Sequence, residues 1–400
     1  MAIQRFVGVD WARGTHVACV VDALGNKLDT SSFEHSYAGI SGWIDRIVEA
    51  AGGDVDSLAV AIETPHHAIV EMLVERGIAV FSLNPKQLDR FRDRHTVAGA
   101  KDDRRDAYVL ADALRTDRER DRRVQLPSER TLLLRELGRA HQALTAELTS
   151  LGNRIQELLV RFFPNALGLG SAHADLWFIQ LLERFPSPSA AKTCRIEDLA
   201  HLKCRKEKKQ AVLAALHEQA VHVAPGLEQA IEIHLRSLLT RWKTTDTERK
   251  AMAARLEKTV GPKPSENVPA PLDDAAIIRS MPGAGVLVTA TLLGEAHAEL
   301  AVRDYGALRC MAGVAPVTRR SGKALLVVRR QACRRRLGEA LYFWAFGAIR
   351  FNVDLRTSYT TYRERGISHG GALRRIADKL LRILIARLRV GKPFEPSLSG

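Results

Sequence analysis

Short apolar runs alternate with amphipathic stretches over residues 1–125. Runs such as RFVGVD and SLAVAIE have the length of buried strands, and ISGWIDRIVEAAG has the periodicity of a helix. The pattern predicts strands at residues 5–10, 16–25, 26–35, 57–63 and 78–85, and helices at residues 40–52, 68–77 and 101–115. Because helices separate the later strands, we expect right-handed crossovers and a central sheet that is parallel in part.

A different pattern begins at Ser128, where apolar residues recur at alternating steps of three and four. The members of this heptad seam are Leu134, Leu137, His141, Leu144, Leu148, Leu151, Ile155 and Leu158. A second stripe consists of Leu227, Ile231, Leu235, Leu238 and Trp242. The two stripes predict a long antiparallel helical hairpin or a dimerising coiled coil, with a smaller helical insert between its arms. A surface stripe that binds an unrelated partner is the alternative.

Residues 261–274, GPKPSENVPAPLDD, are rich in proline and polar residues and predict a linker. Beyond them the pattern predicts helices joined by short loops. We therefore expect an α/β domain at residues 1–125, a helical coiled-coil region at residues 126–262, and a mainly α-helical domain at residues 263–400.

The formal net charge of +14 is distributed unevenly along the chain. Residues 301–400 alone carry a net charge of +15, so the preceding residues are close to neutral. A basic field of this size indicates a polyanionic partner such as nucleic acid, bound through its phosphates. A solvated cationic surface is the alternative interpretation.

Composition also argues against several classes of protein. No run of about 18 apolar residues predicts a membrane span, and the first residues lack the pattern of a secretory signal. We therefore expect a cytoplasmic protein. The cysteines have no C-x-x-C spacing, which argues against a zinc site or a disulfide framework; they are Cys19, Cys194, Cys204, Cys310 and Cys333.

Acidic residues stand at the predicted ends of two strands and at the start of a helix. Asp10 and Glu63 end strands that a parallel sheet would bring to one edge, and Asp103 and Asp106 lie one helical turn apart. Converging carboxylates repel one another unless a divalent cation lies among them, and oxygen ligands without His or Cys favour Mg²⁺ or Mn²⁺. Taken singly, each acid has an ordinary interpretation as a cap, a surface residue or an ion-pair partner.

The segment GVAPVTRRSGKALLVVRR, residues 313–330, places Ser321 between arginine pairs and contains no acid. The arginines suit a phosphodiester, but a serine hydroxyl needs a base or a metal before it can act as a nucleophile. From the residues alone, a turn residue is the stronger interpretation of Ser321. Upstream, Gly283 and Gly285 stand at a helix start, either as a phosphate-binding helix-hairpin-helix turn or as a plain helix–helix turn.

Seven motifs follow one another between residues 6 and 390: VGVDWAR, AIETPHH, FSLNPKQLDRFR, KDDRRDAYVLADALR, SMPGAGVLVTATLLGE, YGALRCMAGVAPVTRRSGK and RERGISHGGALRRIADKLLRILI. Together they resemble the DEDD-type insertion-sequence transposases, recombinases with a RuvC-like nuclease domain and a C-terminal domain that carries a serine. No single motif is specific, but the ordered set is. The middle of the chain matches only as a helix pattern.

The resemblance implies an RNase H-like, RuvC-like fold for the first domain and Mg²⁺ (or Mn²⁺) as its cofactor. The four acids of the family fall on Asp10, Glu63, Asp103 and Asp106. Asp102 stands where the family usually has a small polar residue. It is therefore the alternative to Asp103 as a ligand.

The resemblance also implies that Ser321 attacks DNA and forms a covalent phosphoserine link, activated by the carboxylate site of the other domain or of another subunit. The residues expected to hold nucleic acid are Gly283, Gly285, Arg319, Arg320, Lys323, Arg329, Arg330, Arg334, Arg335 and Arg336. Relatives use a non-coding guide, or bridge, RNA that pairs with target and donor DNA. We expect a nucleoid-associated recombinase that acts on element ends and target DNA, binds such an RNA, and works as a homodimer or homotetramer.

The residues also fit other functions. A RuvC-like junction nuclease would use the same carboxylates with a metal-activated water, and Ser321 would be only structural. A non-catalytic nucleic-acid-binding protein would need none of the acids. A sugar-kinase-like ATP-binding fold shares the opening strand pattern but needs glycine-rich phosphate loops, which the predicted first domain lacks.

Overall fold

The computed structural model describes residues 3–63, 68–83, 88, 91, 102–118, 122–124, 126–173, 175–203, 206–219, 221, 224–264, 272–322 and 324–395. The chain folds as two compact units, Met1–Leu126 and Pro127–Gly400. No helix in these ranges is long and apolar enough to cross a membrane.

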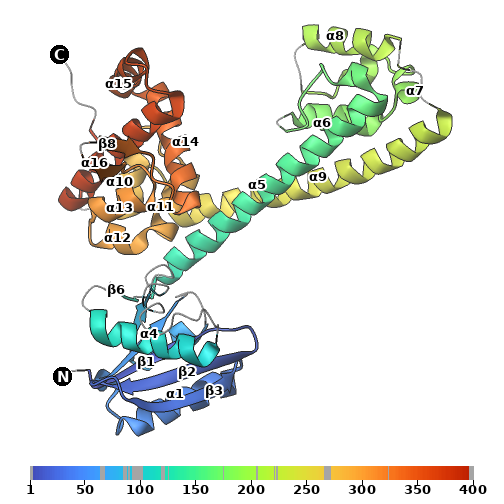
Figure 1. Cartoon of the computed structure of the whole chain (residues 1–400). Coiled ribbons are helices and arrows are strands. Elements are labelled where there is room, and N and C mark those ends of the chain that lie inside the picture. The colour runs from blue at the N-terminus through green and yellow to red at the C-terminus, as the bar shows by residue number, and fades with distance from the viewer. Residues whose placement is uncertain are drawn as a thin grey trace. The chain divides into compact units, whose positions relative to one another are not determined.

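The first unit is built on a six-stranded sheet with the strand order β3-β2-β1-β4-β5-β6 (Figure 1). Its strands are β1 Arg5–Asp10, β2 Thr15–Asp22, β3 Lys27–Glu34, β4 Leu58–Ile62, β5 Ala79–Ser82 and β6 Arg122–Arg123. The pairs β1–β4 and β4–β5 are parallel, and the other pairs are antiparallel. The predicted strands and the partly parallel sheet are confirmed. The sequence did not predict β6, because two arginines show no alternation of apolar and polar positions.

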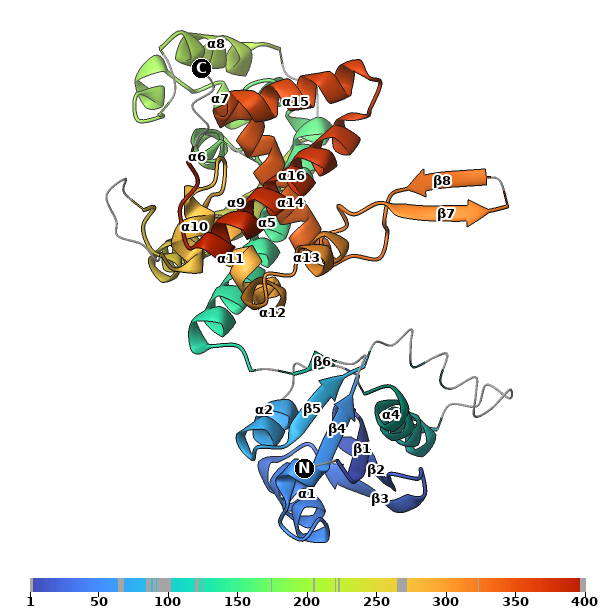
Figure 2. The ribbon, with the colours of Figure 1, turned by 90° about the vertical axis from the view of Figure 1, so that its left-hand side faces the viewer.

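Helices cover both faces of this sheet. On one face lie α1, Tyr37–Ala50, and α2, Ala68–Glu75, where the buried Trp43 stacks on Phe33 of β3. On the other face lies α4, Asp103–Asp117, as Figure 2 shows from the side of the sheet. A mixed α/β unit is therefore confirmed, and its assignment to the RNase H fold stays a prediction.

The contact between β1 and α4 depends on small side chains. A Cβ atom placed on Gly8 would lie 2.0 Å from the carbonyl oxygen of Ala107 and 2.5 Å from the backbone nitrogen of Ala111. Ala59 and Ala61 of the neighbouring strand β4 also belong to the core beneath the helix. The backbone of α4 therefore lies directly on the sheet, which fixes the distance between the helix and the strand ends.

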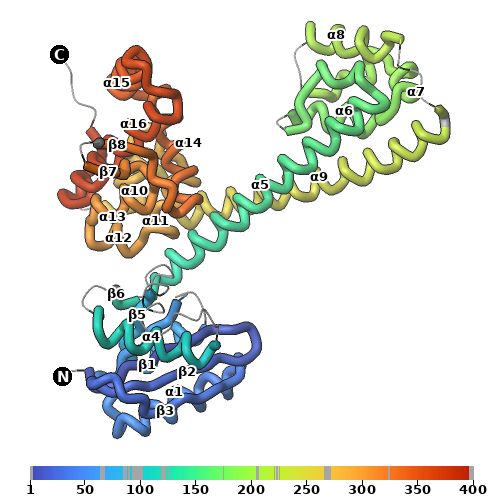
Figure 3. The backbone as a smooth tube through the Cα atoms, in the orientation of Figure 1, coloured from blue at the N-terminus to red at the C-terminus, as the bar shows by residue number. Residues whose placement is uncertain are grey.

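Two long helices, α5 Glu129–Phe162 and α9 Pro225–Val260, form the framework of the second unit (Figure 3). They are antiparallel, because one cluster joins Ile155 to Ile231 and another joins Leu134 to Leu256. The predicted helical hairpin thus forms within one chain, while a dimerising coiled coil stays a prediction. Leu227 is 47% exposed, so its assignment to the buried stripe was wrong.

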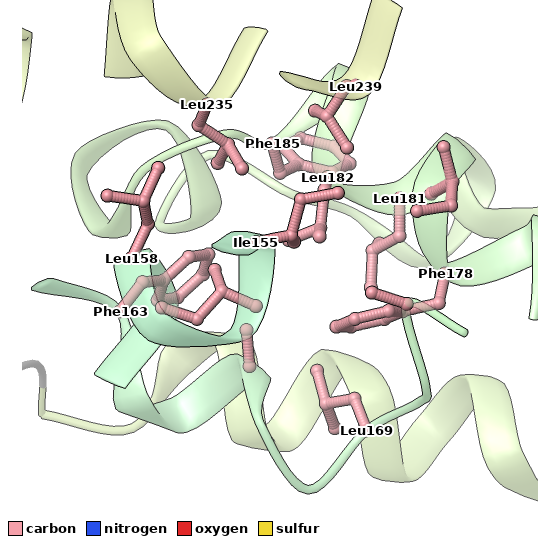
Figure 4. Packing of buried hydrophobic residues seen from close by; sticks show 14 of the residues in the cluster. Ile155, Leu158, Phe163, Leu169, Phe178, Leu181, Leu182, Phe185, Leu235 and Leu239 are labelled. Carbon is pink, nitrogen blue, oxygen red and sulfur yellow. The ribbon is translucent and has the colours of Figure 1, made fainter. Parts of the chain in front are cut away.

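The predicted insert between the two long helices consists of α6 Leu176–Arg184, α7 Pro188–Ala191 and α8 Lys206–His217. Figure 4 shows side chains of α5, α6 and α9 meeting in one apolar core. These side chains include Ile155, Leu158, Phe178, Leu181, Leu182, Leu235 and Leu239. The insert therefore closes this end of the helical pair.

The C-terminal part has one apolar core, to which its two longest helices, α14 Arg335–Phe351 and α16 His369–Val390, contribute most of the buried side chains. Its other helices are α10 Asp274–Ser280, α11 Val286–Glu295, α12 His297–Ala301, α13 Tyr305–Met311 and α15 Val353–Glu364. Trp344 of α14 is fully buried, and its Nε1 donates to the carbonyl oxygen of Pro282 at 3.0 Å. Ala290 of α11 packs against Leu134 of α5, which attaches this part to the framework. The prediction of helices joined by short loops is confirmed for most of this part of the chain.

The basic segment after α13 is a β-hairpin, whereas the sequence pattern predicts only helices joined by short loops in this part of the chain. Its strands are β7 Val317–Ser321 and β8 Ala324–Val328, which pair antiparallel and project from the helices (Figure 2). The prediction failed because neither strand alternates between buried and exposed side chains: Arg319, Arg320, Leu325 and Leu326 are all exposed. Pairing of the two backbones, and not burial, defines these strands.

Replacing Gly8 by Ala should destabilise the first unit by more than about 2 kcal/mol, because the methyl group would have to displace helix backbone. Thermal unfolding of the full chain measures the loss. The matched control is Gly42→Ala in α1, where a Cβ meets nothing within 4 Å. That change should be neutral or slightly stabilising. Equal losses in the two variants would contradict the close-packing argument.

Candidate functional site

Two acids stand side by side at the carboxyl edge of the sheet. Asp10 is the last residue of β1, and Glu63 directly follows β4. The parallel register pairs Val9 with Ile62, so the two acids come next to each other one step further along. In both strands, alternate residues before the acid belong to the core beneath α4. Because successive side chains of a strand alternate between the two faces of a sheet, Asp10 and Glu63 lie on the same face as these residues, which is the face that α4 covers.

The first turn of α4 carries the other acids. Asp102 is the N-cap residue, and its carboxylate accepts a hydrogen bond from the backbone nitrogen of Arg104 at 3.2 Å. Asp103 is exposed, whereas Asp106 is only 3% exposed. Capping engages the carboxylate of Asp102, whereas Asp103 and Asp106 lie one helical turn apart. The choice of Asp103 over Asp102 as a ligand stays a prediction.

The carboxylates therefore belong to two strand ends and to the helix that covers them. A donor set made only of carboxylate oxygens fits Mg²⁺ or Mn²⁺. Across the ranges that the structure describes, no group of three or more His, Cys, Asp or Glu side chains has the spacing to hold a metal ion. The structure thus brings Asp10 and Glu63 to neighbouring positions and Asp103 and Asp106 to one helix, but it does not draw all four around one point.

A histidine pair beside Asp10 was missed at the sequence level. His16 is fully buried at the start of β2, and its Nε2 lies 2.9 Å from Nδ1 of His35. Because the backbone N–H of Ala12 donates to Nδ1 of His16, at 3.3 Å, Nε2 of His16 carries the proton and donates to His35. The ring of Trp11 lies edge-on to His35. These contacts hold the turn that follows Asp10, and no sequence motif singled them out.

Ser321 lies at the tip of the β7–β8 hairpin. It pairs with Ala324, and Gly322 in the turn has a left-handed φ of 56°. Ser321 and Arg319 share one face of the hairpin, because alternate residues of a strand point the same way, and Arg320 lies on the other face. All three side chains are exposed. The tip therefore offers a hydroxyl and one guanidinium together on an accessible face.

Two of the arginines predicted to bind DNA are engaged within the protein. Arg334 donates to the carbonyl oxygen of Glu295 in α11, and Nε of Arg336 donates to Oε1 of Gln142 in α5 at 2.9 Å. Both contacts attach the start of α14 to neighbouring helices. A structural role thus accounts for these two side chains.

The other basic residues of the predicted set differ in their contacts. Arg335 forms an ion pair with Glu339 at 2.8 Å. Arg329 and Arg330 make no hydrogen bond or ion pair with any residue in the described ranges. Lys323 lies outside the described residues. Among the described residues, Arg319 and Arg320 of β7 and the two arginines directly after β8 therefore carry charge without a counter-charge.

The two glycines before α11 have different surroundings. Gly283 has a left-handed φ of 73°, and a Cβ on it would lie 2.4 Å from the backbone nitrogen of Ala348. Gly285 is the N-cap residue of α11, and a Cβ there would meet nothing within 4 Å. Close packing against α14 explains Gly283, so only Gly285 has open space beside it. Phosphate binding by this turn stays a prediction.

Comparisons with known protein families give two matches along the chain. A family model described as "Transposase" matches residues 7–164, and one described as "Transposase IS116/IS110/IS902 family" matches residues 275–360. The first match includes all four acids and the second includes Ser321.

Among individual relatives, a putative transposase, y4uE, of Sinorhizobium fredii is 40% identical over 50% of this chain and 57% of its own length. The mini-circle putative transposase for IS117 of Streptomyces coelicolor is 29% identical over 98% of this chain and 96% of its own length. An uncharacterized protein of insertion element IS110 from the same organism is also 29% identical, over 98% of this chain and 95% of its own length. The chain therefore spans little more than half of the first relative and nearly all of the other two.

If the carboxylates hold a divalent cation, Mn²⁺ should raise the thermal unfolding midpoint of the first unit, because the ion binds only the folded state. Asp103→Asn should lose most of this rise. Asp102→Ser should keep it, because the serine hydroxyl preserves the helix cap. Calorimetry of the full chain at increasing Mn²⁺ measures the effect. Loss of the rise in Asp102→Ser alone would instead identify Asp102 as the ligand.

Proposed function

The chain belongs to the IS116/IS110/IS902 family of insertion-sequence transposases, and from this premise we propose that it cuts and rejoins DNA with Ser321 as the nucleophile. The observation that carries this proposal is the exposed hairpin tip, where Ser321 and Arg319 share one face. An accessible hydroxyl beside a guanidinium suits attack on a phosphodiester. The acids of the first unit complete the proposal as ligands of Mg²⁺ or Mn²⁺.

The proposed step is a transesterification. The Oγ atom of Ser321 forms a bond to phosphorus, its proton passes to a base, and the bond from phosphorus to a DNA oxygen breaks. The released DNA end takes up a proton and becomes a hydroxyl. Attack by the hydroxyl of another DNA end reverses the step and frees Ser321, so strands are exchanged without an external energy source.

Arg319 and the acids of the first unit have separate roles in the proposed step. Arg319 lies beside Ser321 and would hold the non-bridging oxygens of the phosphate, whose negative charge grows in the transition state. Asp10, Glu63, Asp103 and Asp106 would hold a divalent cation that polarises the phosphodiester. Because these acids belong to a different unit from Ser321, the proposed site is split, assembled within a chain or between chains.

Two partners complete the proposal. Strand exchange needs several active sites, so we include a homodimer or homotetramer. The family resemblance adds a guide RNA from the element that pairs with target and donor DNA. The strongly basic last quarter of the chain, with a net charge of +15 over residues 301–400, supports binding of both nucleic acids.

One rival function has an observation in its favour. Asp10 and Glu63 are neighbours at one sheet edge, and a metal-activated water there would cut DNA without help from Ser321. Such a junction nuclease would hydrolyse the phosphodiester and would leave no covalent link between protein and DNA. The two functions therefore differ in a directly measurable product.

Ser321→Ala should abolish the covalent protein–DNA adduct and all strand transfer, because the bond to phosphorus can no longer form. Labelled element-end DNA is incubated with Mg²⁺ and the element RNA, and adducts are separated on denaturing gels. Thr318→Ala is the matched control, since it removes an exposed hydroxyl from the opposite face of the same strand. Undiminished cleavage by Ser321→Ala, with no adduct in wild type, would establish the hydrolytic nuclease.

The two arginines of β7 should contribute unequally. Arg319→Ala should slow adduct formation by about 10²-fold, the usual cost of losing one donor to transition-state charge. Arg320→Ala removes the same charge from the opposite face and should slow the reaction only a few-fold. Single-turnover rates at saturating DNA separate this effect from binding. Equal losses would show that the face of the hairpin has no role.

A further inference from the structure

A cavity of about 610 Å³ lies in the second unit at the base of the β7–β8 hairpin. Residues that follow β8, the start of α14 and the start of α16 line it. Its basic lining residues are Arg329, Arg335 and Arg374. The cavity is thus at the opposite end of the hairpin from Ser321.

The positive charge in this cavity is only partly neutralised. Glu339 also lines the cavity, but it is already paired with Arg335 at 2.8 Å and accepts from Gln142 at 2.6 Å. Within the part of the chain that the structure describes, Arg329 and Arg374 have no hydrogen bond or ion-pair partner. Among the described residues, two guanidinium groups of this cavity therefore have no counter-charge.

The surroundings of Arg374 make this arrangement unfavourable without a ligand. Its guanidinium folds back over the first turn of α16, since Cβ atoms on Gly370 and Gly371 would lie 3.5 and 3.8 Å from its Nη1 and Nη2. The positive end of a helix dipole disfavours a cation there. Burial, and then the neighbouring Arg329, lower the pKa of Arg374. Like charges held together in the folded protein favour an anion that binds between them.

We propose that this cavity, the Arg329–Arg374 pocket, binds a phosphodiester of the DNA backbone and anchors the strand that Ser321 attacks. Guanidinium groups suit this ligand, because each can donate two parallel hydrogen bonds to phosphate oxygens. The choice of DNA rests on the function proposed for the hairpin. Binding at this pocket is sequence-independent, since it reads only the backbone.

The hairpin sets the distance between pocket and nucleophile. From Ala324 to Val328, β8 spans four residue steps, or about 14 Å of extended chain. That length corresponds to about four nucleotides at an axial rise of about 3.4 Å per nucleotide. The pocket would therefore hold a phosphate about four nucleotides from the one that Ser321 attacks.

Charge-removing variants of the full chain test the pocket. Arg374→Gln and Arg329→Gln should each weaken binding of duplex DNA about tenfold and lower the slope of log affinity against log salt by about one. The double variant should lose little more than either single one, because both residues hold the same phosphate. Fluorescence anisotropy of the Ser321→Ala protein measures binding without chemistry, so this test does not depend on the nucleophile.

The matched control is Arg375→Gln. Arg375 is exposed on the next position of α16, over the ring of Tyr362 at 5.3 Å, and its loss removes the same net charge. It should change affinity less than twofold. Equal weakening by Arg374→Gln and Arg375→Gln would overturn the pocket in favour of a diffuse basic surface. Weakened binding of single-stranded RNA with unchanged binding of DNA would overturn the assignment to DNA.

Two further measurements separate the pocket from a structural role of Arg374. Arg374→Lys keeps the charge but loses the pair of parallel donors, so it should recover only part of the affinity that Arg374→Gln loses. Arg374→Gln should not lower the thermal unfolding midpoint, because it removes a repulsion between like charges. A neutral methylphosphonate about four nucleotides from the reacting phosphate should weaken wild type but not Arg374→Gln. A methylphosphonate that weakens both proteins equally would overturn the assigned position.

Discussion

Close contact between the backbone of α4 and the surface of β1 is the constraint on which the first unit depends. Gly8 permits the contact, since any Cβ would lie within 2.0 Å of a helix carbonyl oxygen. Because the helix lies so low on the sheet, its first turn carries Asp103 and Asp106 over the face to which Asp10 and Glu63 belong. The close approach of α4 to the sheet thus depends on one strand residue that has no side chain, and the β1–β4 register places Asp10 beside Glu63.

In the second unit, too, a glycine permits close packing of the backbone. Gly283 lets the turn before α11 pack against α14, where Trp344 donates to the carbonyl oxygen of Pro282. Arg130 of α5 binds the last carbonyl oxygens of α9 and the carboxylate of Asp273 before α10. These contacts join the helical framework to the C-terminal helices. Rigid helices thereby support a hairpin whose tip has almost no packing of its own, which is how scaffolds commonly present reactive residues.

The basic residues of the C-terminal part serve two different purposes. Arg334 and Arg336 attach α14 to its neighbours, and Arg309 holds Asp378 at 2.6 Å. Arg319, at the hairpin tip, and Arg329, at its base, are exposed. Net charge alone therefore overstates the surface available to nucleic acid. Neither Arg319 nor Arg329 has an ion-pair partner among the described residues, so the hairpin keeps positive charge at both of its ends.

The sequence by itself determined the strands of the first unit, the helical pair of the second, the acids at strand and helix ends, and the location of the positive charge. Each of these is a local or periodic property, since burial on one face repeats every two or every 3.6 residues. Only the tertiary structure decided that Asp102 caps α4, that the basic segment is a hairpin, and that Ser321 shares a face with Arg319 and not with Arg320. It alone also brought Arg374 to Arg329 across 45 positions of the chain. Hydrogen bonds and charge contacts between distant residues leave no periodic trace in the sequence, and for that reason they could not be predicted from it.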